Sequence, residues 1–389
     1  MESLPGRCGF REVGAVINAI EAIREKGYQV TYIQGYQNET EELGEKQLQD
    51  TIEKLKQEYR KKDCVILYFI GLTESYEGEG YDRKNLKIPQ NQEELLAEIA
   101  ETVGKDHIAA ISFGGAPMDF SFEKNVGAIL HMYLGGQAVG ESVADLISGE
   151  VNPSGKLAET IPFSEKDTPA WRYFAPPNDD VEYRESIFVG YRYYETFHVP
   201  VKYPFGYGLS YTDFKIETQS VTADADKVTV KVKVTNTGST YSGKEIVQVY
   251  YSAPDSAEAE KEYQELGGFA KTDELAPGES QILTISYDTK DMAYYNEDQA
   301  AYILDKGKYY VRVGDSSRNT SVEATIEVDD TTLTEQLSNQ MEVPDGEDLV
   351  EWSKPEEGYS YPTEEAEKEA APVIKVDASE IKTEDHASA

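Results

Sequence analysis

The hydrophobic pattern changes once along the chain, and this change constrains the fold more than any other feature. In the first part, short apolar runs alternate with amphipathic stretches of helical spacing. From about residue 212, apolar residues recur at every second position, and turn signals separate the runs. The first pattern is typical of a parallel sheet covered by helices, and the second of a β-sandwich. The sequence therefore predicts two domains of different class.

The first part has the order expected of βαβ units. Helical spacing of apolar residues covers residues 12–25, 45–61, 91–102 and about 138–148. Short apolar or β-branched runs cover residues 28–33, 64–70, 107–113 and 129–134. This alternation predicts a parallel sheet with helices on both faces.

The second part is predicted to be all-β. Val228, Val230, Val232 and Val234 alternate with Thr and Lys, which is typical of a half-buried strand. Further strands are predicted at residues 245–251, 280–287, 307–313 and 321–328. Such a series of short strands with intervening turns predicts a sandwich of immunoglobulin or fibronectin type.

The charge of the chain limits its partners. The 37 Lys and Arg residues face 73 Asp and Glu residues, which gives a net charge of -36. This charge repels phosphate groups, so we expect neither nucleic acid nor a membrane as a partner. Residues 331–389 hold 16 Asp or Glu, four Lys or Arg and four Pro, so we expect an acidic linker or tail there. A solubilising end and an acidic binding segment both stay open.

Cysteine and histidine usage is sparse. Cys8 and Cys64 stand alone and the four His are scattered, so we expect no zinc site, no disulfide framework and no cofactor. The chain has no apolar run of about 18 residues, and its first ten residues lack the apolar stretch of a signal peptide. A cytoplasmic location is the expectation that follows.

The loop after the predicted strand at 64–70 is the first candidate site, because ligands bind beyond the carboxyl ends of strands in open α/β sheets. Gly78 and Gly80 flank Glu79, so the backbone can turn sharply there and present the carboxyl group. Arg83 could orient a carboxylate or a substrate hydroxyl. From the chemistry of these residues alone, the alternative interpretation of a solvated loop without a function is not excluded. The acidic residues of this loop are Glu74, Glu77, Glu79 and Asp82.

A series of motifs continues from this loop in a fixed order. It begins with GEGYDR at 78–83, followed by Leu86, Pro89, Gln92 and Leu95. The next motifs are GGQA at 135–138, ADL at 144–146, VNPSGKL at 151–157, YRE at 183–185, VGYRYY at 189–194 and YPFGYGLSY at 203–211. The last are KE at 244–245, VQVYY at 247–251, LGGF at 266–269 and LAPGE at 275–279. Over about residues 10–330, this series resembles glycoside hydrolase family 3, which includes many β-glucosidases.

The resemblance implies a domain order and a set of roles. It implies an α/β sandwich domain at 1–165 whose first strand is missing, a connection at 166–211 and a fibronectin type III-like domain at 212–330. It implies that Glu79 is the catalytic acid/base and that Asp82 and Arg83 bind substrate, a β-linked glucoside or oligosaccharide. The alternative is a noncatalytic carbohydrate-binding or structural interaction module. Substrate choice between β-glucoside and β-xyloside stays open.

The resemblance also implies a missing partner. In the family the nucleophile is an aspartate on a (β/α)8 barrel, which needs about 200 residues or more. No part of this sequence can hold such a barrel. We therefore expect a domain-permuted member whose barrel is supplied in cis by the full-length protein or in trans, and we expect the isolated chain to be inactive.

Other conspicuous residues have structural explanations. The aromatic cluster Tyr191, Tyr193, Tyr194 and Phe197 is expected to be core or a contact between domains. Asp119 is expected to cap a helix or to line the site. His131 lies in an apolar run and is expected to be a satisfied core histidine. A nucleotide-binding function is disfavoured because no GxGxxG or Walker sequence follows a strand.

Overall fold

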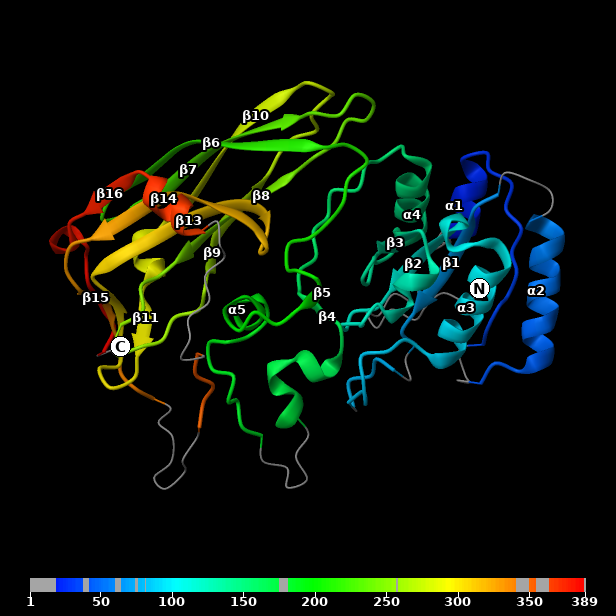
Figure 1. The fold of residues 1–389 in the computed structure, drawn as a ribbon, viewed down its shortest axis with the longest axis horizontal. Helices are drawn as coiled ribbons and strands as arrows, with labels where there is room; N and C mark the ends of the chain where they lie inside the picture. The colour runs from blue at the N-terminus through cyan, green and yellow to red at the C-terminus, as the bar shows by residue number, and fades with distance from the viewer. Residues whose placement is uncertain are drawn as a thin grey trace. The chain divides into compact units, whose positions relative to one another are not determined.

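The chain forms two compact units, which are described separately (Figure 1). A computed structural model describes residues 19–37, 42–59, 64–73, 76–80, 82–174, 181–256, 258–340, 350–354 and 364–387. The first unit comprises the described residues of Met1–Val151 and Ile161–Glu165. The second unit comprises those of Asn152–Thr160 and Lys166–Ala389.

The first unit is built on a parallel sheet of strand order β1-β2-β3. The strands are β1 (Ile66–Gly71), β2 (Ile108–Phe113) and β3 (Ala128–His131), and β4 (Ile161–Pro162) lies outside this sheet. The helices are α1 (Ala19–Glu25), α2 (Glu45–Tyr59), α3 (Gln90–Val103) and α4 (Val139–Ser148), with short 3-10 turns at Lys105–His107 and Ser121–Asn125. A further 3-10 turn, Glu165–Asp167, lies where the chain passes from the first unit to the second. The predicted α/β class is confirmed.

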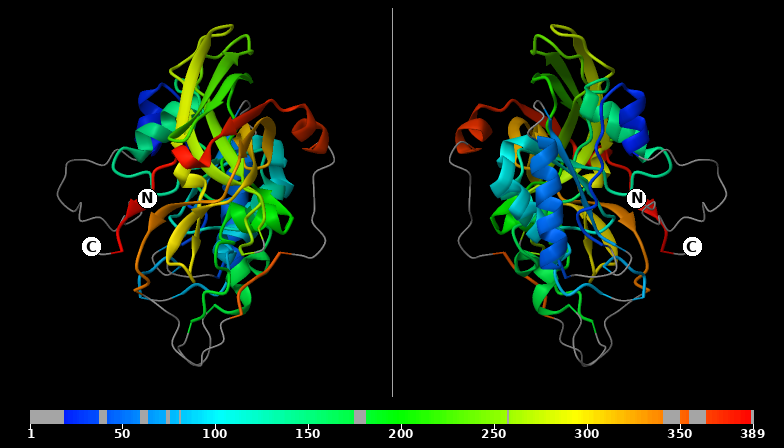
Figure 2. Two further views of the ribbon diagram at one scale, coloured as in Figure 1. Left: turned by 90° about the vertical axis from the view of Figure 1, so that its left-hand side faces the viewer. Right: turned by 90° about the vertical axis from the view of Figure 1, so that its right-hand side faces the viewer.

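Helices cover both faces of the sheet. Successive side chains of a strand point to opposite faces. Ile111 and Phe113 pack in one cluster with α1 and α4. On the opposite face, the Tyr68 hydroxyl donates to the carbonyl of Gln92 on α3 at 2.8 Å. Helix α2 packs against α3, and the two lie side by side in Figure 2.

The N-terminal part of this unit differs from the expectation. The run 28–33, predicted as a strand, forms none, and Tyr28 and Tyr32 are about half exposed. The residues after this run are held by side-chain hydrogen bonds and not by pairing with a neighbouring strand. Gln47 Nε2 donates to the Gly35 carbonyl at 3.2 Å, and the Tyr36 hydroxyl donates to the Phe69 carbonyl at 2.7 Å. Two predictions concern residues outside the described part of the chain. They are the start of the first helix, at residues 12–18, and the missing first strand. Cys8 also lies outside the described residues.

The second unit contains a β-sandwich. One sheet has the order β10-β7-β6, another β16-β14-β13-β8-β9 and a third β11-β12-β15-β17. These strands are β6 (Phe214–Ala223), β7 (Lys227–Asn236), β8 (Ile246–Ser252), β9 (Glu265–Lys271), β10 (Ser280–Asp288), β11 (Tyr294–Asn296), β12 (Ala301–Leu304), β13 (Gly307–Ser316), β14 (Asn319–Val328), β15 (Thr332–Gln336), β16 (Val373–Val376) and β17 (Glu384–Asp385).

The core of the sandwich follows the period-two pattern. The alternating valines of β7 are fully buried and pack with Val249 of β8, Val311 of β13 and Ile326 of β14. The predicted all-β fibronectin-type domain is confirmed by this arrangement. Short 3-10 turns lie at Pro169–Arg172, Thr289–Met292 and Ala378–Glu380.

The aromatic run near residue 191 packs as core. It forms α5 (Tyr191–Thr196), which precedes β5 (Val201–Tyr203). Tyr193 and Tyr194 are buried in a cluster with Phe188. Trp352 from the C-terminal segment meets the Tyr193 ring edge-on at 5.6 Å between ring centroids. The core role expected for Tyr193 and Tyr194 is therefore confirmed.

The acidic C-terminal segment is folded where the structure describes it. The charge pattern predicted a linker or tail at 331–389, but β15, α6 (Glu364–Ala370), β16 and β17 lie within that range. Strand β16 pairs in parallel with β14, and β17 with β15. Val376, Ala378 and Ile381 join the sandwich core. We call residues 350–354 and 364–387 the C-terminal strap.

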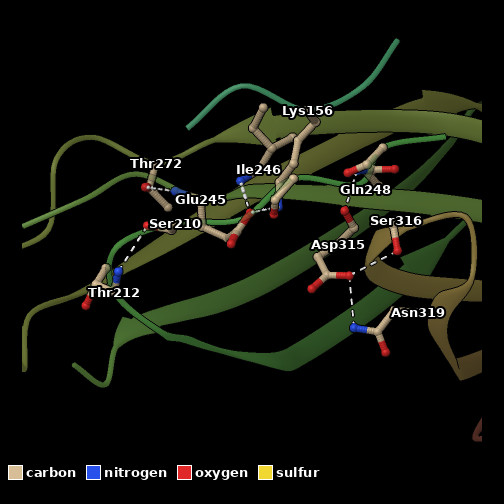
Figure 3. A network of polar contacts seen from close by, with 12 residues as sticks. Lys156, Ser210, Thr212, Glu245, Ile246, Gln248, Thr272, Asp315, Ser316 and Asn319 are labelled. Atoms are coloured by element: carbon tan, nitrogen blue, oxygen red, sulfur yellow. Dashed lines mark hydrogen bonds and ion pairs between the residues drawn. The ribbon is translucent and has the colours of Figure 1, made fainter. Parts of the chain in front are cut away.

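Motif residues tie the segment at 152–160 and the turn at 203–211 to the sandwich (Figure 3). Lys156 and Glu245 form an ion pair of 2.8 Å in which both side chains are nearly buried. Gln248 Nε2 donates to the Asp315 carbonyl at 2.6 Å and to the Gly206 carbonyl at 3.2 Å. Gly206 has φ +81, and a Cβ there would lie 2.3 Å from the Gln248 side chain. These motifs therefore have structural roles.

Candidate functional site

The candidate loop leaves the sheet at the carboxyl end of β1, where buried Gln92 fixes its first residue. Gln92 Oε1 accepts from the Gly71 amide at 2.9 Å, and Gln92 Nε2 donates to the Gly71 carbonyl at 3.0 Å. The Leu72 amide then donates to the Phe113 carbonyl at 3.1 Å. Both polar groups of Gly71 are thus satisfied inside the protein, as buried backbone requires. The sequence signal for Gln92 was a polar residue on the face of α3 that carries Leu95.

Three contacts tie the loop to the segment that follows β2. The Gly115 amide donates to both carboxylate oxygens of Glu77, at 2.9 and 3.1 Å. The Arg83 guanidinium donates to the Pro117 carbonyl. The Asp119 amide donates to the Leu86 carbonyl at 3.0 Å. The loops after β1 and β2 are therefore joined at this edge of the sheet.

The predicted catalytic and binding residues lie between these contacts. Glu79 and Asp82 are exposed, and Arg83 is half-buried. The structure thus brings all three onto one short segment whose two ends are anchored. Glu74 and Tyr81 lie outside the described residues. The roles predicted for Glu79, Asp82 and Arg83 stay predictions, and the Pro117 contact of Arg83 was not foreseen.

Asp119, whose amide contacts the Leu86 carbonyl, also has a local side-chain contact. Its side chain is 4 % exposed, and Oδ1 accepts from the Ser121 amide at 2.9 Å, at the start of a 3-10 turn. This contact closes a local turn just before the 3-10 helix, whose N-cap residue is Phe120 and carries no side-chain cap, so the helix cap expected of Asp119 is not formed.

His131 ends β3 beside the same edge of the sheet. Its Nδ1 lies 2.9 Å from Ser112 Oγ, and its ring contacts the rings of Phe120 and Tyr133. Burial lowers the pKa of His131 to about 4, although a hydrogen bond with Ser112 acts in the opposite sense. The imidazole is therefore neutral near pH 7; the expected hydrogen-bond partner is present, while the residue itself is only partly buried.

We expect this histidine to make the first unit less stable in acid. Between about pH 6.5 and pH 4 the unfolded chain protonates His131 but the folded chain does not. The contribution of neutral His131 to the free energy of unfolding is therefore fully present above about pH 6.5. It is lost as pH falls from there to about 4, by at most about 1.4 kcal/mol per pH unit. The measurement is an NMR titration of the His131 ring, together with denaturant unfolding of wild type and His131→Gln at several pH values. A stability difference between the two proteins that does not change with pH would contradict the expectation.

The described part of the chain offers no metal site and no membrane span. No three of its His, Cys, Asp and Glu side chains gather closely enough to hold a metal ion. None of the helices in the ranges given above is long and apolar enough to cross a membrane. The chemistry that the candidate loop can offer is that of a carboxyl group presented at a sheet edge.

Comparison with known proteins assigns the chain. The model of the glycosyl hydrolase family 3 C-terminal domain matches residues 9–211. The chain belongs to glycosyl hydrolase family 3. A fibronectin type III-like domain model matches residues 245–317 of this family 3 chain, in the order that the motif series implied.

The relatives of this family 3 chain are longer proteins. It is 38% identical over 306 residues to thermostable beta-glucosidase B of Acetivibrio thermocellus, which covers 78% of this chain and 39% of the relative. It is 35% identical over 320 residues to an exo-alpha-(1->6)-L-arabinopyranosidase of Bifidobacterium breve, covering 82% of this chain and 41% of that protein.

A solved structure agrees with the fold. The GH3 beta-glucosidase of Bifidobacterium adolescentis superposes with a TM-score of 0.73 at 34% identity, covering 87% of this chain and 48% of that one. The family 3 chain therefore spans less than half the length of the relatives it matches.

Proposed function

We propose that this chain supplies the general acid/base, Glu79, of a retaining glycoside hydrolase of β-glucosidase type. The observation that carries the proposal is the placement of Glu79 on an exposed segment at the carboxyl edge of the sheet, with anchoring contacts on both sides. This edge is where open α/β sheets place their ligands. The GEGYDR motif at 78–83 and the β-glucosidase relatives support the same role.

The reaction that we propose has two steps, and Glu79 acts in both. In the first, protonated Glu79 donates its proton to the glycosidic oxygen while an aspartate bonds to the anomeric carbon and the aglycone leaves as an alcohol. In the second, the Glu79 carboxylate takes a proton from water, whose oxygen displaces the aspartate from the anomeric carbon. The sugar is released with its configuration retained, and Glu79 is protonated again.

The aspartate comes from a (β/α)8 barrel in this proposal. The two carboxyl groups of a retaining enzyme stand about 5 to 5.5 Å apart, so the barrel must bring its aspartate against the exposed segment that carries Glu79. We propose that the barrel belongs to the same full-length protein in a permuted order, or to a partner chain. The relatives include both a beta-glucosidase and an arabinopyranosidase, so the sugar that this chain serves is left open between these classes.

The test restores the missing part. The full 389-residue chain replaces the matched 39% of the Acetivibrio thermocellus enzyme, and hydrolysis of aryl β-glucoside and β-xyloside is measured for this chimera and for the chain alone. We expect turnover by the chimera and none by the chain alone. Turnover by the chain alone would place the nucleophile within the 389 residues. Sugar binding by the chimera without turnover would favour a noncatalytic carbohydrate-binding module.

A further inference from the structure

The segment that carries Glu79 is held by a side chain on either side of it. Two residues before Glu79, the Glu77 carboxylate accepts from the Gly115 amide with both oxygens, at 2.9 and 3.1 Å. Four residues after Glu79, the Arg83 guanidinium donates to the Pro117 carbonyl. Gly115 and Pro117 both belong to the loop after β2, so these two contacts join the Glu79 segment to that loop.

The contact at Gly115 fits a carboxylate closely. A Cβ at Gly115 would lie 2.5 Å from Glu77 Oε1 and 2.7 Å from the Leu134 side chain. A larger residue at this position would therefore require the Glu77 carboxylate or the Leu134 side chain to shift. Hydrogen bonds in which the acceptor is ionised are roughly twice as strong as neutral ones.

The direction of Glu77 is set from the β1 side. The amides of Tyr76 and Glu77 both donate to the Thr73 carbonyl, at 2.8 and 3.0 Å. Thr73 lies two residues after Gly71, whose backbone Gln92 fixes. Contacts of described residues on the β1 side therefore hold both Gly71 and Glu77, which lies two residues before Glu79.

We propose that Glu77 is a positioning residue for Glu79, with Arg83 as the second anchor. The proposal rests on the acid/base role proposed for Glu79. A general acid must reach the glycosidic oxygen within hydrogen-bond distance, and a displacement of about 1 Å can lower the rate about 10²-fold. Glu77 acts here through its bond to the backbone of the second loop and does not touch the substrate.

The first test needs no activity. Amide hydrogen exchange is measured on the full chain for wild type, Glu77→Ala, Glu77→Gln and the control Glu98→Ala, an exposed acid on α3. We expect exchange at Gly115 to rise about 10- to 100-fold in Glu77→Ala, the ratio that corresponds to a hydrogen bond to a charged group. The exchange rate of the Gly115 amide in Glu77→Gln should lie between those of wild type and Glu77→Ala, because the glutamine side-chain oxygen still accepts a hydrogen bond. The control Glu98→Ala should exchange at the wild-type rate. Unchanged exchange at Gly115 in Glu77→Ala would overturn the proposal.

The second test uses the chimera and compares two leaving groups. We expect Glu77→Ala to lower kcat for phenyl β-glucoside about 10²-fold with little change in KM, and to lower it less for a dinitrophenyl β-glucoside, whose leaving group needs no proton. Glu77→Gln should restore part of the loss. If Glu79→Ala abolishes turnover while Glu77→Ala does not alter kcat, the positioning role is wrong and the function of Glu79 stands. If Glu79→Ala has no effect, both proposals fail.

Discussion

Replacing Glu364 with alanine is expected to lower the free energy of unfolding of the second unit by about 3 to 5 kcal/mol, because it leaves a buried charge without its partner. The side chains of Glu364 and Arg312 are 4% and 3% exposed and form an ion pair. Lys368 Nζ lies 2.7 Å from the same carboxylate. Among the described residues, Arg312 would keep the hydrogen bond to Ser252 Oγ, at 2.7 Å from its Nε, and the contact with the ring of Tyr263, neither of which carries a negative charge.

The measurement is guanidinium unfolding followed by tryptophan fluorescence. Both tryptophans of the chain, Trp171 and Trp352, belong to the second unit, so the signal reports that unit. Glu365→Ala is the matched control, because the Glu365 side chain is 68% exposed and lies 3.5 Å from Lys368. We expect a change of at most about 1 kcal/mol for the control. A Glu364→Ala loss no larger than that of the control would contradict the buried ion pair.

The same carboxylate makes the strap sensitive to acid. Burial by itself would raise the pKa of Glu364, but the hydrogen bond from Lys368 and the charge of Arg312 outweigh it, and the pKa lies below its ordinary value. The stability that this ion pair contributes is therefore present above the ordinary carboxyl pKa and is lost as pH falls through the lowered one.

Glu79→Ala in the chimera is expected to lower kcat/KM for phenyl β-glucoside by about 10²-fold or more, because the departing phenolate then receives no proton. With a dinitrophenyl β-glucoside, the rate of the first step should fall less, because its leaving group needs no proton. The glycosyl-enzyme formed from it should then accumulate, because no base activates water. Added azide, which needs no base, is expected to release that intermediate as a glycosyl azide. Kinetics with and without azide provide the measurement.

The control for this substitution is Glu98→Ala, which removes an exposed carboxylate elsewhere in the same unit. We expect it to leave both substrates unaffected. A Glu79→Ala loss that is equal for the two leaving groups and unchanged by azide would argue for a binding role of Glu79. Loss of the fold would appear in the circular dichroism spectrum of the variant.

The elements that the sequence predicted are those with strong local periodicity. The four valines of β7 bury one face because side chains alternate across a strand, and this needs no knowledge of the partner strands. The apolar face of α3, with Leu95 and Leu96, likewise follows from helical spacing. The motif around Glu79 could also be recognised from the sequence, because its residues are contiguous in the chain.

The contacts that the sequence did not predict join residues far apart in the chain. Gln92 binds Gly71, Glu77 binds Gly115, and Glu364 binds Arg312. Each looks like an ordinary polar residue until the fold brings its partner near it. The run 28–33 shows the opposite error, because β-branched and aromatic residues favour a strand but a strand needs a paired neighbour.

The C-terminal strap also determines which strand edges meet the solvent. An open edge offers unpaired amides and carbonyls on which a strand of another molecule can add. Without β16 and β17, β14 and β15 would each become the last strand of a sheet. The strap fills both places, and β17 is itself composed of Glu384 and Asp385, both exposed. At β17 the two carboxylates thus place like charges where the edges of two copies would otherwise pair, and they disfavour the addition of a further strand at that edge.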